Sequence, residues 1–181
     1  MPTTTPPDPA TVTRVLKRVR QTRDYLSEPV PEDALRDILD AARWTGSVSN
    51  SQPWTFIVVT DTETRRRMAE AATNTPHIGI APVVVCVALE PRGLETDNFD
   101  EGRLAERIMI AAAAHGLSAG IGRARADAQG TIGDLLGVPP DRVVRTMVSI
   151  GYPTEAGAAP KSKPGEARRA LDDLVRRERF G

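Results

Sequence analysis

Four short segments of this sequence carry most of the side chains that could hold a polar ligand. The first is Arg20-Gln21-Thr22-Arg23, in which two guanidinium groups flank an amide and a hydroxyl. Guanidinium groups bind phosphate through paired hydrogen bonds, and a neighbouring hydroxyl or amide can complete the cradle. A solvated basic surface would carry the same residues, so this run alone leaves both interpretations open.

The second segment is Ser47–Trp54, with the sequence SVSNSQPW, which connects a predicted helix to a predicted strand. A plain connector also needs polar residues for its turns. Asn50 and Gln52, however, are two residues apart, and in an extended loop they could present their amides on the same side. Such a pair would suit a heteroaromatic ring that has donors and acceptors at its edge. We interpret Trp54 as a core residue.

The third segment is Gly116–Arg123, whose glycines would let backbone N–H groups come close to a flat ligand. It lacks the third glycine and the later acidic residue of a dinucleotide-binding loop, and no Walker-type phosphate loop occurs anywhere in the chain. The fourth segment is Arg168-Arg169, which follows Lys161 and Lys163. A solvated helix face would explain this fourth segment as well as a ligand would.

The composition disfavours several kinds of function and site. Lys plus Arg equals Asp plus Glu at 24 each, and aromatic residues make up only 4%, which disfavours a nucleic-acid-binding module. Basic residues nevertheless cluster between residues 10 and 23 and between 161 and 179, so the two clusters could converge on one anion. The single cysteine, Cys86, lies in an apolar run and is interpreted as buried. With only His77 and His115 beside it, no zinc site is expected.

Several elements are needed to position these segments. Asp8 as a cap and Pro9 at the first helical position predict the first helix, and Pro31 starts a second that ends near Gly46. The run Pro82–Leu89 is apolar at every position, which predicts an interior strand covered on both faces. Further expected elements are strands at Thr55–Thr60 and Arg145–Ile150, a helix from Asp61 or Thr62 to about Asn74, a helix at Thr131–Leu136 and a C-terminal helix at Glu166–Arg177.

A helix that begins near Asp100 changes from charged to apolar over Ile108–Ala114, before Gly116 stops it. A helix that is apolar on all sides is buried on all sides, so this one should be central. Either it packs wholly within the chain or it forms a subunit interface. We expect residues 1–9 to be disordered and residues 10–181 to form one domain. No apolar run is long enough to cross a bilayer, and we expect a cytoplasmic protein.

The order of these motifs resembles the nitroreductase family from residue 12 to about residue 176. The most specific parts are the PVP-helix-SxxNxQPW block and the LLGVP and IGYP motifs. The resemblance implies an α+β fold with a mostly antiparallel central sheet flanked by helices. It also implies a homodimer with FMN at the interface.

The resemblance assigns cofactor contacts to the segments described above. Arg20, Gln21, Thr22 and Arg23 would contact the FMN phosphate, ribityl chain and pyrimidine edge, and Arg168 would reach the phosphate. The residues that would line the flavin, largely from the partner subunit, are Ser47, Val48, Ser49, Asn50 and Gln52. Those beside the ring, near its reactive nitrogen, are Ile121, Gly122 and Arg123.

The chain also departs from the family pattern at two places. Val19 precedes Arg20 where consecutive arginines are usual, so Arg18 could share the phosphate contacts. Gly46 stands where proline is common, which loosens the turn into the flavin loop.

The reaction that the resemblance implies is hydride transfer from NAD(P)H through FMN to a nitroaromatic, a quinone or a similar small acceptor. The cofactor carries this chemistry, so we name no catalytic side chain. The same FMN site could instead serve dehalogenation, reduction of an unsaturated bond or flavin breakdown, which need a lid over the ring. The intervals Asn74–Pro82 and Glu90–Asp97 are short, so we expect an open pocket. A flavin-storage protein without turnover is a further alternative, and a deazaflavin could replace the nicotinamide donor.

Overall fold

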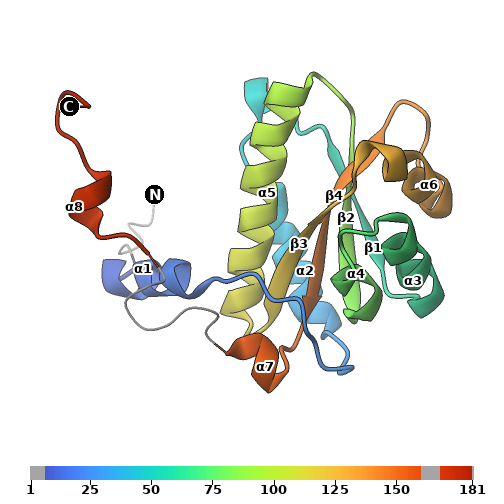
Figure 1. Cartoon of the computed structure of the whole chain (residues 1–181), viewed down its shortest axis with the longest axis horizontal. Helices are drawn as coiled ribbons and strands as arrows, with labels where there is room; N and C mark the ends of the chain where they lie inside the picture. Colours follow the sequence, from blue (N-terminus) through green and yellow to red (C-terminus); the bar gives the residue numbers. More distant parts are fainter. Residues whose placement is uncertain (1–6, 160–167, 181) are drawn as a thin grey trace, which may run out of the picture.

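One antiparallel sheet of four strands forms the centre of the molecule (Figure 1). The computed structural model describes residues 7–159 and 168–180. The strands are β1 (Trp54–Val59), β2 (Val83–Leu89), β3 (Ser118–Arg123) and β4 (Val143–Gly151), arranged in the order β1-β2-β4-β3. Every residue of β2 is buried and the strand is paired on both sides, which confirms the interior strand expected from its unbroken apolar run.

Helices cover both faces of this sheet, because alternate residues of its strands point in opposite directions. On one face, Val83, Val85 and Val87 pack with α2 (Glu32–Arg43) and α5 (Leu94–Ala114). On the other face, Val84 and Cys86 join a cluster that includes α3 (Thr62–Ala71), α4 (His77–Ile80) and α6 (Ala126–Leu136). The α+β fold with a flanked antiparallel sheet is therefore confirmed. Burial raises the pKa of the Cys86 thiol to about 12, so this cysteine is inert.

The local signals for helix starts are confirmed. The Asp8 carboxylate accepts hydrogen bonds from the backbone N–H groups of Ala10 and Thr11, and α1 spans Pro9–Arg18. Asp61 caps α3 in the same way through Thr64 N. The second helix begins at Glu32, directly after Pro31, and ends at Arg43, a little before Gly46.

Several expected elements have different limits in the structure. The helix α6 begins at Ala126, five residues before the predicted Thr131, and α3 ends at Ala71 rather than near Asn74. The central helix α5 begins at Leu94 rather than near Asp100, because its acidic first turns are buried against cations of the sheet. Most of the third segment, Gly116–Arg123, is the edge strand β3, which the sequence did not predict. Of the predicted range Glu166–Arg177, only the single turn α8 (Leu171–Leu174) is helical, and residues 166 and 167 lie outside the described residues. Both leucines of α8 are exposed, so no packing extends that helix.

The N-terminal helix α1 leaves its apolar face uncovered. No residue of α1 is buried, and Val12 and Leu16 are 41% and 47% exposed. In the apolar stretch of α5, Ile108 is buried but Ile110 and Ala113 are only half-buried, so this helix is not covered on all sides within one chain. A short turn, α7 (Glu155–Ala158), follows β4. Within the described residues, no helix is long and apolar enough to span a membrane.

Candidate functional site

The Arg20–Arg23 run lies along the free edge of β3. Gln21 forms a parallel bridge with Ala119, and the Thr22 N–H donates to the Ala119 carbonyl oxygen at 2.9 Å. The Gln21 Oε1 accepts a hydrogen bond from the Ile121 N–H at 3.0 Å. The structure thus brings together the first and third segments predicted from the sequence, although they are about a hundred residues apart.

Gly120 makes this close approach possible. A Cβ at position 120 would lie 2.2 Å from the Thr22 carbonyl oxygen and 3.0 Å from the Tyr25 hydroxyl. No other residue type fits between β3 and the Arg20–Arg23 run without moving the backbone. At this glycine, the missing side chain makes room for the protein's own backbone.

Tyr25 holds the same run from its C-terminal side, which sequence reasoning did not predict. Its buried hydroxyl donates to the Thr22 carbonyl oxygen and lies 2.7 Å from the Ser149 Oγ on β4. Burial raises the pKa of Tyr25 to about 12, so the hydroxyl stays protonated at neutral pH. The Ser149 hydroxyl in turn donates to the Gly120 carbonyl oxygen at 3.0 Å. Nothing in the local sequence around Tyr25 indicates these distant partners.

Removing the Tyr25 hydroxyl should make the folded protein measurably less stable. We expect Tyr25→Phe to lower the free energy of unfolding by about 1–2 kcal/mol, because the Thr22 carbonyl oxygen loses a buried donor. Urea unfolding followed by circular dichroism measures this change. Tyr152→Phe is the matched control, since the described residues show no hydrogen bond to that hydroxyl. Equal midpoints for the two variants would contradict the role given to Tyr25.

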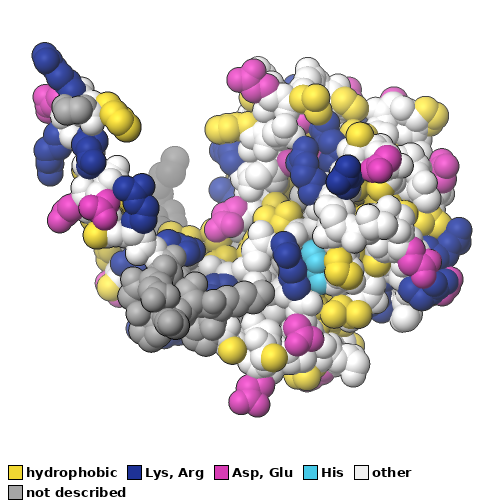
Figure 2. Space-filling view, in the orientation of Figure 1, with side chains coloured by type: hydrophobic (Ala, Val, Ile, Leu, Met, Phe, Trp, Pro, Cys, Tyr) yellow, Lys and Arg dark blue, Asp and Glu magenta, His cyan; other side chains and the backbone are white. Residues whose placement is uncertain are grey.

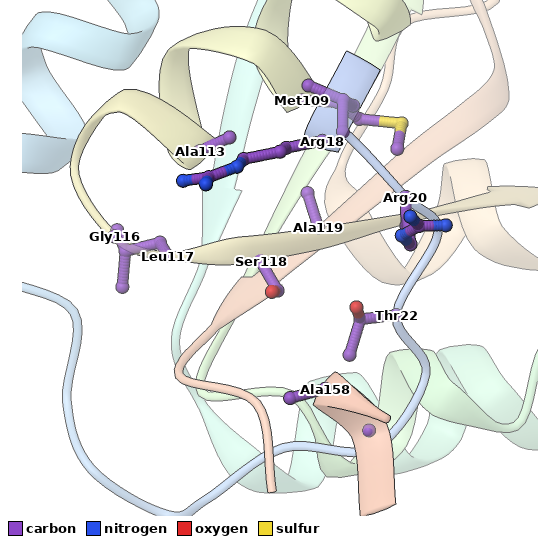
Figure 3. Close-up of a pocket in the computed structure, with 12 residues that line it drawn as sticks. Arg18, Arg20, Thr22, Met109, Ala113, Gly116, Leu117, Ser118, Ala119 and Ala158 are labelled. Carbon is purple, nitrogen blue, oxygen red and sulfur yellow. The ribbon is translucent and has the colours of Figure 1, made fainter. Parts of the chain in front are cut away.

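A pocket of about 250 Å³ lies beside this run, between the end of α1, the end of α5 and the start of β3 (Figure 3). Its polar side chains are Arg18, Arg20, Thr22 and Ser118, and none of the residues that line it is acidic. In Figure 3, the Arg18 side chain extends across the pocket toward Ala113. Two guanidinium groups and two hydroxyls in a small pocket without carboxylates suit a phosphate group. The residues present therefore fit the phosphate end of a nucleotide cofactor.

The C-terminal end of β3 carries the remaining residues of the third segment. Ile121 is half-buried, Gly122 is buried and Arg123 is exposed. The Arg123 guanidinium donates to Asn98 Oδ1 at 2.6 Å and lies 3.8 Å from Glu101 Oε2, both on α5. The Arg123 carbonyl oxygen accepts a hydrogen bond from Asn74 Nδ2 at 3.1 Å. This end of the strand is thus fixed from two sides.

A buried ion cluster lies behind Arg123 and was not predicted. Arg145 on β4 pairs with Asp97 at 2.8 Å, and its Nε lies 3.4 Å from Glu101 Oε2. All three residues are at most 5% exposed. Burial raises the pKa of Glu101, and the nearby Arg145 charge opposes that shift. The cluster anchors the first turns of α5 to the sheet.

The second segment, Ser47–Gln52, precedes β1 and so lies at the opposite edge of the sheet from β3. The Ser47 Oγ accepts from the Gln52 N–H at 2.8 Å, and the Val48 N–H donates to Asp100 Oδ2 at 3.1 Å. Ser49, Asn50 and Gln52 all have left-handed backbone conformations, with φ of 54°, 51° and 47°. Three such residues in one loop are costly, and this kind of strain gathers at ligand-binding sites.

Two further positions of the predicted site are placed as follows. A Cβ at Gly46 would lie 2.8 Å from an Arg103 guanidinium nitrogen, so the glycine leaves room for that side chain. Arg168 is exposed and precedes α8, on a segment that carries several arginine side chains and stands clear of the sheet (Figure 2). Its approach to a phosphate stays a prediction, as does the meeting of the Ser47–Gln52 loop with the Arg20–Arg23 run.

Comparison with known proteins identifies the family of this chain. Residues 16–76 match the family model described as the nitroreductase family. A protein from Archaeoglobus fulgidus named as an NADH dehydrogenase/NAD(P)H nitroreductase is 32% identical over 143 residues, which cover 75% of this chain and 82% of that protein. The chain belongs to the nitroreductase family. An NADH dehydrogenase from Thermus thermophilus is 48% identical over 73 residues, which cover 40% of this chain but only 35% of that protein.

One solved structure has the same fold over nearly the whole length of the present chain. It is an FMN-dependent nitroreductase from Clostridium difficile, with a TM-score of 0.80 and 24% sequence identity, and the match covers 92% of this chain and 98% of that one. At this identity the likeness speaks for the fold alone. The nitroreductase-like architecture predicted from the motif order is therefore confirmed.

Proposed function

We propose that this protein is an FMN-dependent oxidoreductase that passes hydride from NAD(P)H to a small acceptor such as a nitroaromatic or a quinone. Membership of the nitroreductase family makes the chain an oxidoreductase with FMN as cofactor and NAD(P)H as donor. The observation that carries the proposal is the pocket lined by Arg18 and Arg20. The adjoining residue Gln21 is hydrogen-bonded to Ile121, further along β3.

The residues of the predicted site would contact different parts of the FMN molecule. Arg20, with Arg18, would hold the FMN phosphate, because both guanidinium groups line the pocket. Gln21, Thr22 and Arg23 would contact the ribityl chain and the pyrimidine edge. The end of β3, Ile121–Arg123, would lie beside the ring. Arg168 would add a second positive charge to the phosphate from the C-terminal segment.

Bound FMN supplies the redox chemistry by taking a hydride from the donor and passing it to the acceptor. The chain's own part is to bind and orient the cofactor and to exclude water from it. The hydrogen bonds of Gln21, Asn74 and Asn98 fix the end of β3 before any ligand arrives, which reduces the cost of ordering it. No catalytic side chain is assigned.

A homodimer would bring the two halves of the site together. The Ser47–Gln52 loop lies at the sheet edge opposite Arg20–Arg23 within one chain, so we propose that a second copy supplies the loop residues Ser47, Val48, Ser49, Asn50 and Gln52. The exposed apolar residues that such a copy could cover are Val12, Leu16, Trp44, Val48 and Phe99. Covering them would remove apolar surface from water, which is the main driving force of association.

We propose that the protein accepts a range of small molecules, because the two intervals expected to be able to form a lid are short. Part of the interval Asn74–Pro82 folds as α4, which packs against β3 and β4. The other interval reduces to residues 90–93 between β2 and α5. Dehalogenation and the other reactions that need a lid over the ring are the alternative use of the same site. The predicted single domain of residues 10–181 and the cytoplasmic location remain proposals.

One experiment on the purified protein tests this function. We expect a visible flavin spectrum, or its appearance after addition of FMN, that is bleached by NADPH or NADH without oxygen and restored by a nitroaromatic. Analytical ultracentrifugation of the same sample should give the mass of a dimer. A protein that binds no FMN would contradict the proposed function. Bound flavin that neither NADH nor NADPH bleaches would favour flavin storage or another donor. A monomeric FMN-bound protein would contradict the shared site.

A further inference from the structure

The turn from Asn74 to Ile78 packs directly behind the end of β3. A Cβ at Gly122 would lie 3.1 Å from Ile78 Cδ1 and 3.2 Å from Thr75 Cγ2, so these two side chains pack directly against the strand. Asn74 holds the Arg123 carbonyl oxygen at 3.1 Å from the same turn. The turn therefore supports the three residues proposed to lie beside the flavin ring.

His77, at the centre of this turn, has a buried imidazole with no hydrogen-bond partner. The residue is 2% exposed, and both ring nitrogens are buried and unpaired among the described residues. Burial, followed by the nearby charge of Arg23, lowers the pKa of His77 to about 4, so the ring is neutral at pH 7. A neutral imidazole has one N–H donor and one acceptor nitrogen, and leaving both unpaired in the interior is unfavourable.

The surroundings of His77 indicate where a partner would come from. The Ile121 backbone lies within hydrogen-bonding reach of the ring and favours its protonated form, although neither ring nitrogen makes a hydrogen bond of ordinary geometry. The nearby charge of Arg23 disfavours the protonated form. The N–H and C=O of one strand residue point to the same side, and the Ile121 N–H faces Gln21 at the free edge of β3. The Ile121 carbonyl oxygen therefore faces that edge as well. Both neighbours of His77 belong to the proposed cofactor site.

A purely apolar side chain would fill this position without an unpaired donor or acceptor. Native proteins pair almost all buried polar groups, so an orphaned imidazole beside a ligand site requires an explanation. The Ile121 backbone, which lies beside the ring, is the partner that the imidazole would take.

We propose that His77 is a positioning residue for bound FMN: its neutral imidazole hydrogen-bonds to the Ile121 backbone when the cofactor is in place. This bond holds Ile121–Arg123 and the neighbouring Arg23 in their binding arrangement. The inference rests on the proposed function, since it concerns the same cofactor site. It adds a residue that touches the segments holding the flavin rather than the flavin itself.

A matched pair of variants tests the proposal. Glutamine and methionine have nearly the same length, but only glutamine can donate and accept hydrogen bonds. We expect His77→Gln to bind FMN within about threefold of the unaltered protein and His77→Met to bind about tenfold more weakly, as expected for one lost hydrogen bond. FMN titration of the apoprotein, followed by quenching of flavin fluorescence, measures both dissociation constants. Thermal unfolding of both apoproteins establishes that they fold.

A second readout separates positioning from general packing. The absorption maximum and the midpoint potential of bound FMN should shift in His77→Met and return in His77→Gln, because a loss of packing alone would affect the two variants alike. His115→Met is the control, since His115 pairs with Asp37 at the far end of α5. Equal FMN affinity and equal spectra for His77→Gln and His77→Met would overturn the inference while leaving the FMN function intact. Failure of the unaltered protein to bind FMN would instead overturn the function.

Discussion

Replacing Arg145 by methionine should destabilise the folded protein by about 3–5 kcal/mol, because it leaves two buried carboxylates without their cation. Arg145 lies 2.8 Å from Asp97 and 3.4 Å from Glu101, and the three residues are almost fully buried. Arg123 is at 3.8 Å from Glu101 and half-exposed, so it compensates little. For a chain of this length the loss corresponds to a fall in melting temperature of roughly 6–20 °C.

Removing the orphaned charges should restore much of this stability. We expect the triple variant Arg145→Met, Asp97→Asn, Glu101→Gln to recover at least half of the loss measured by urea unfolding. Uncharged groups cost less to bury than unpaired carboxylates do. The cycle built from the single, double and triple variants isolates the interaction energy of the cluster. Arg145→Met with an unchanged unfolding midpoint would show that the cluster contributes nothing to the anchoring of α5.

Elements that depend on neighbouring residues could be predicted from the sequence. Asp8 and Pro9 define the start of α1 because capping involves groups three residues apart or fewer. The run Pro82–Leu89 predicts a covered strand because its own composition excludes exposure to water. In β3, Gly120 and Gly122 interrupt the alternation of side chains, so the sequence does not predict this strand. The predicted C-terminal helix is longer than the observed one. Its apolar periodicity predicts a helix, but Leu171 is exposed and no packing stabilises further turns.

Partners far apart in the chain could not be predicted from local patterns. Arg145 and Asp97 are separated by 48 residues, and Tyr25 and Ser149 by 124, so no spacing rule connects them. Gln21 and Ile121 were placed in one site only because the whole order of motifs resembles a family. His77 offered no signal at all, since one histidine between Pro76 and Ile78 is equally consistent with a core position. Burial and pairing, which only the structure gives, distinguish these residues.

Arg20→Ala should weaken FMN binding by about ten- to hundredfold, as expected from losing a charge-assisted hydrogen bond worth about 1.5–3 kcal/mol. Arg20 lines the pocket together with Arg18. Arg18→Ala should therefore have an effect of similar size, because Arg18 reaches across the pocket. Binding by both single variants should also depend less on salt, since each removes one contact to the phosphate.

The control for this prediction comes from the same helix. Arg14 bonds to the Thr11 hydroxyl and does not line the pocket, so Arg14→Ala should keep the FMN affinity of the unaltered protein. Arg168→Ala tests the contribution of the C-terminal segment in the same titration and should also weaken binding. Riboflavin, which lacks the phosphate, should bind equally to the unaltered protein and to the Arg18 and Arg20 variants. Unchanged FMN affinity in Arg20→Ala and Arg168→Ala would contradict the phosphate assignment, and a parallel loss of riboflavin binding would place these arginines at the ring instead.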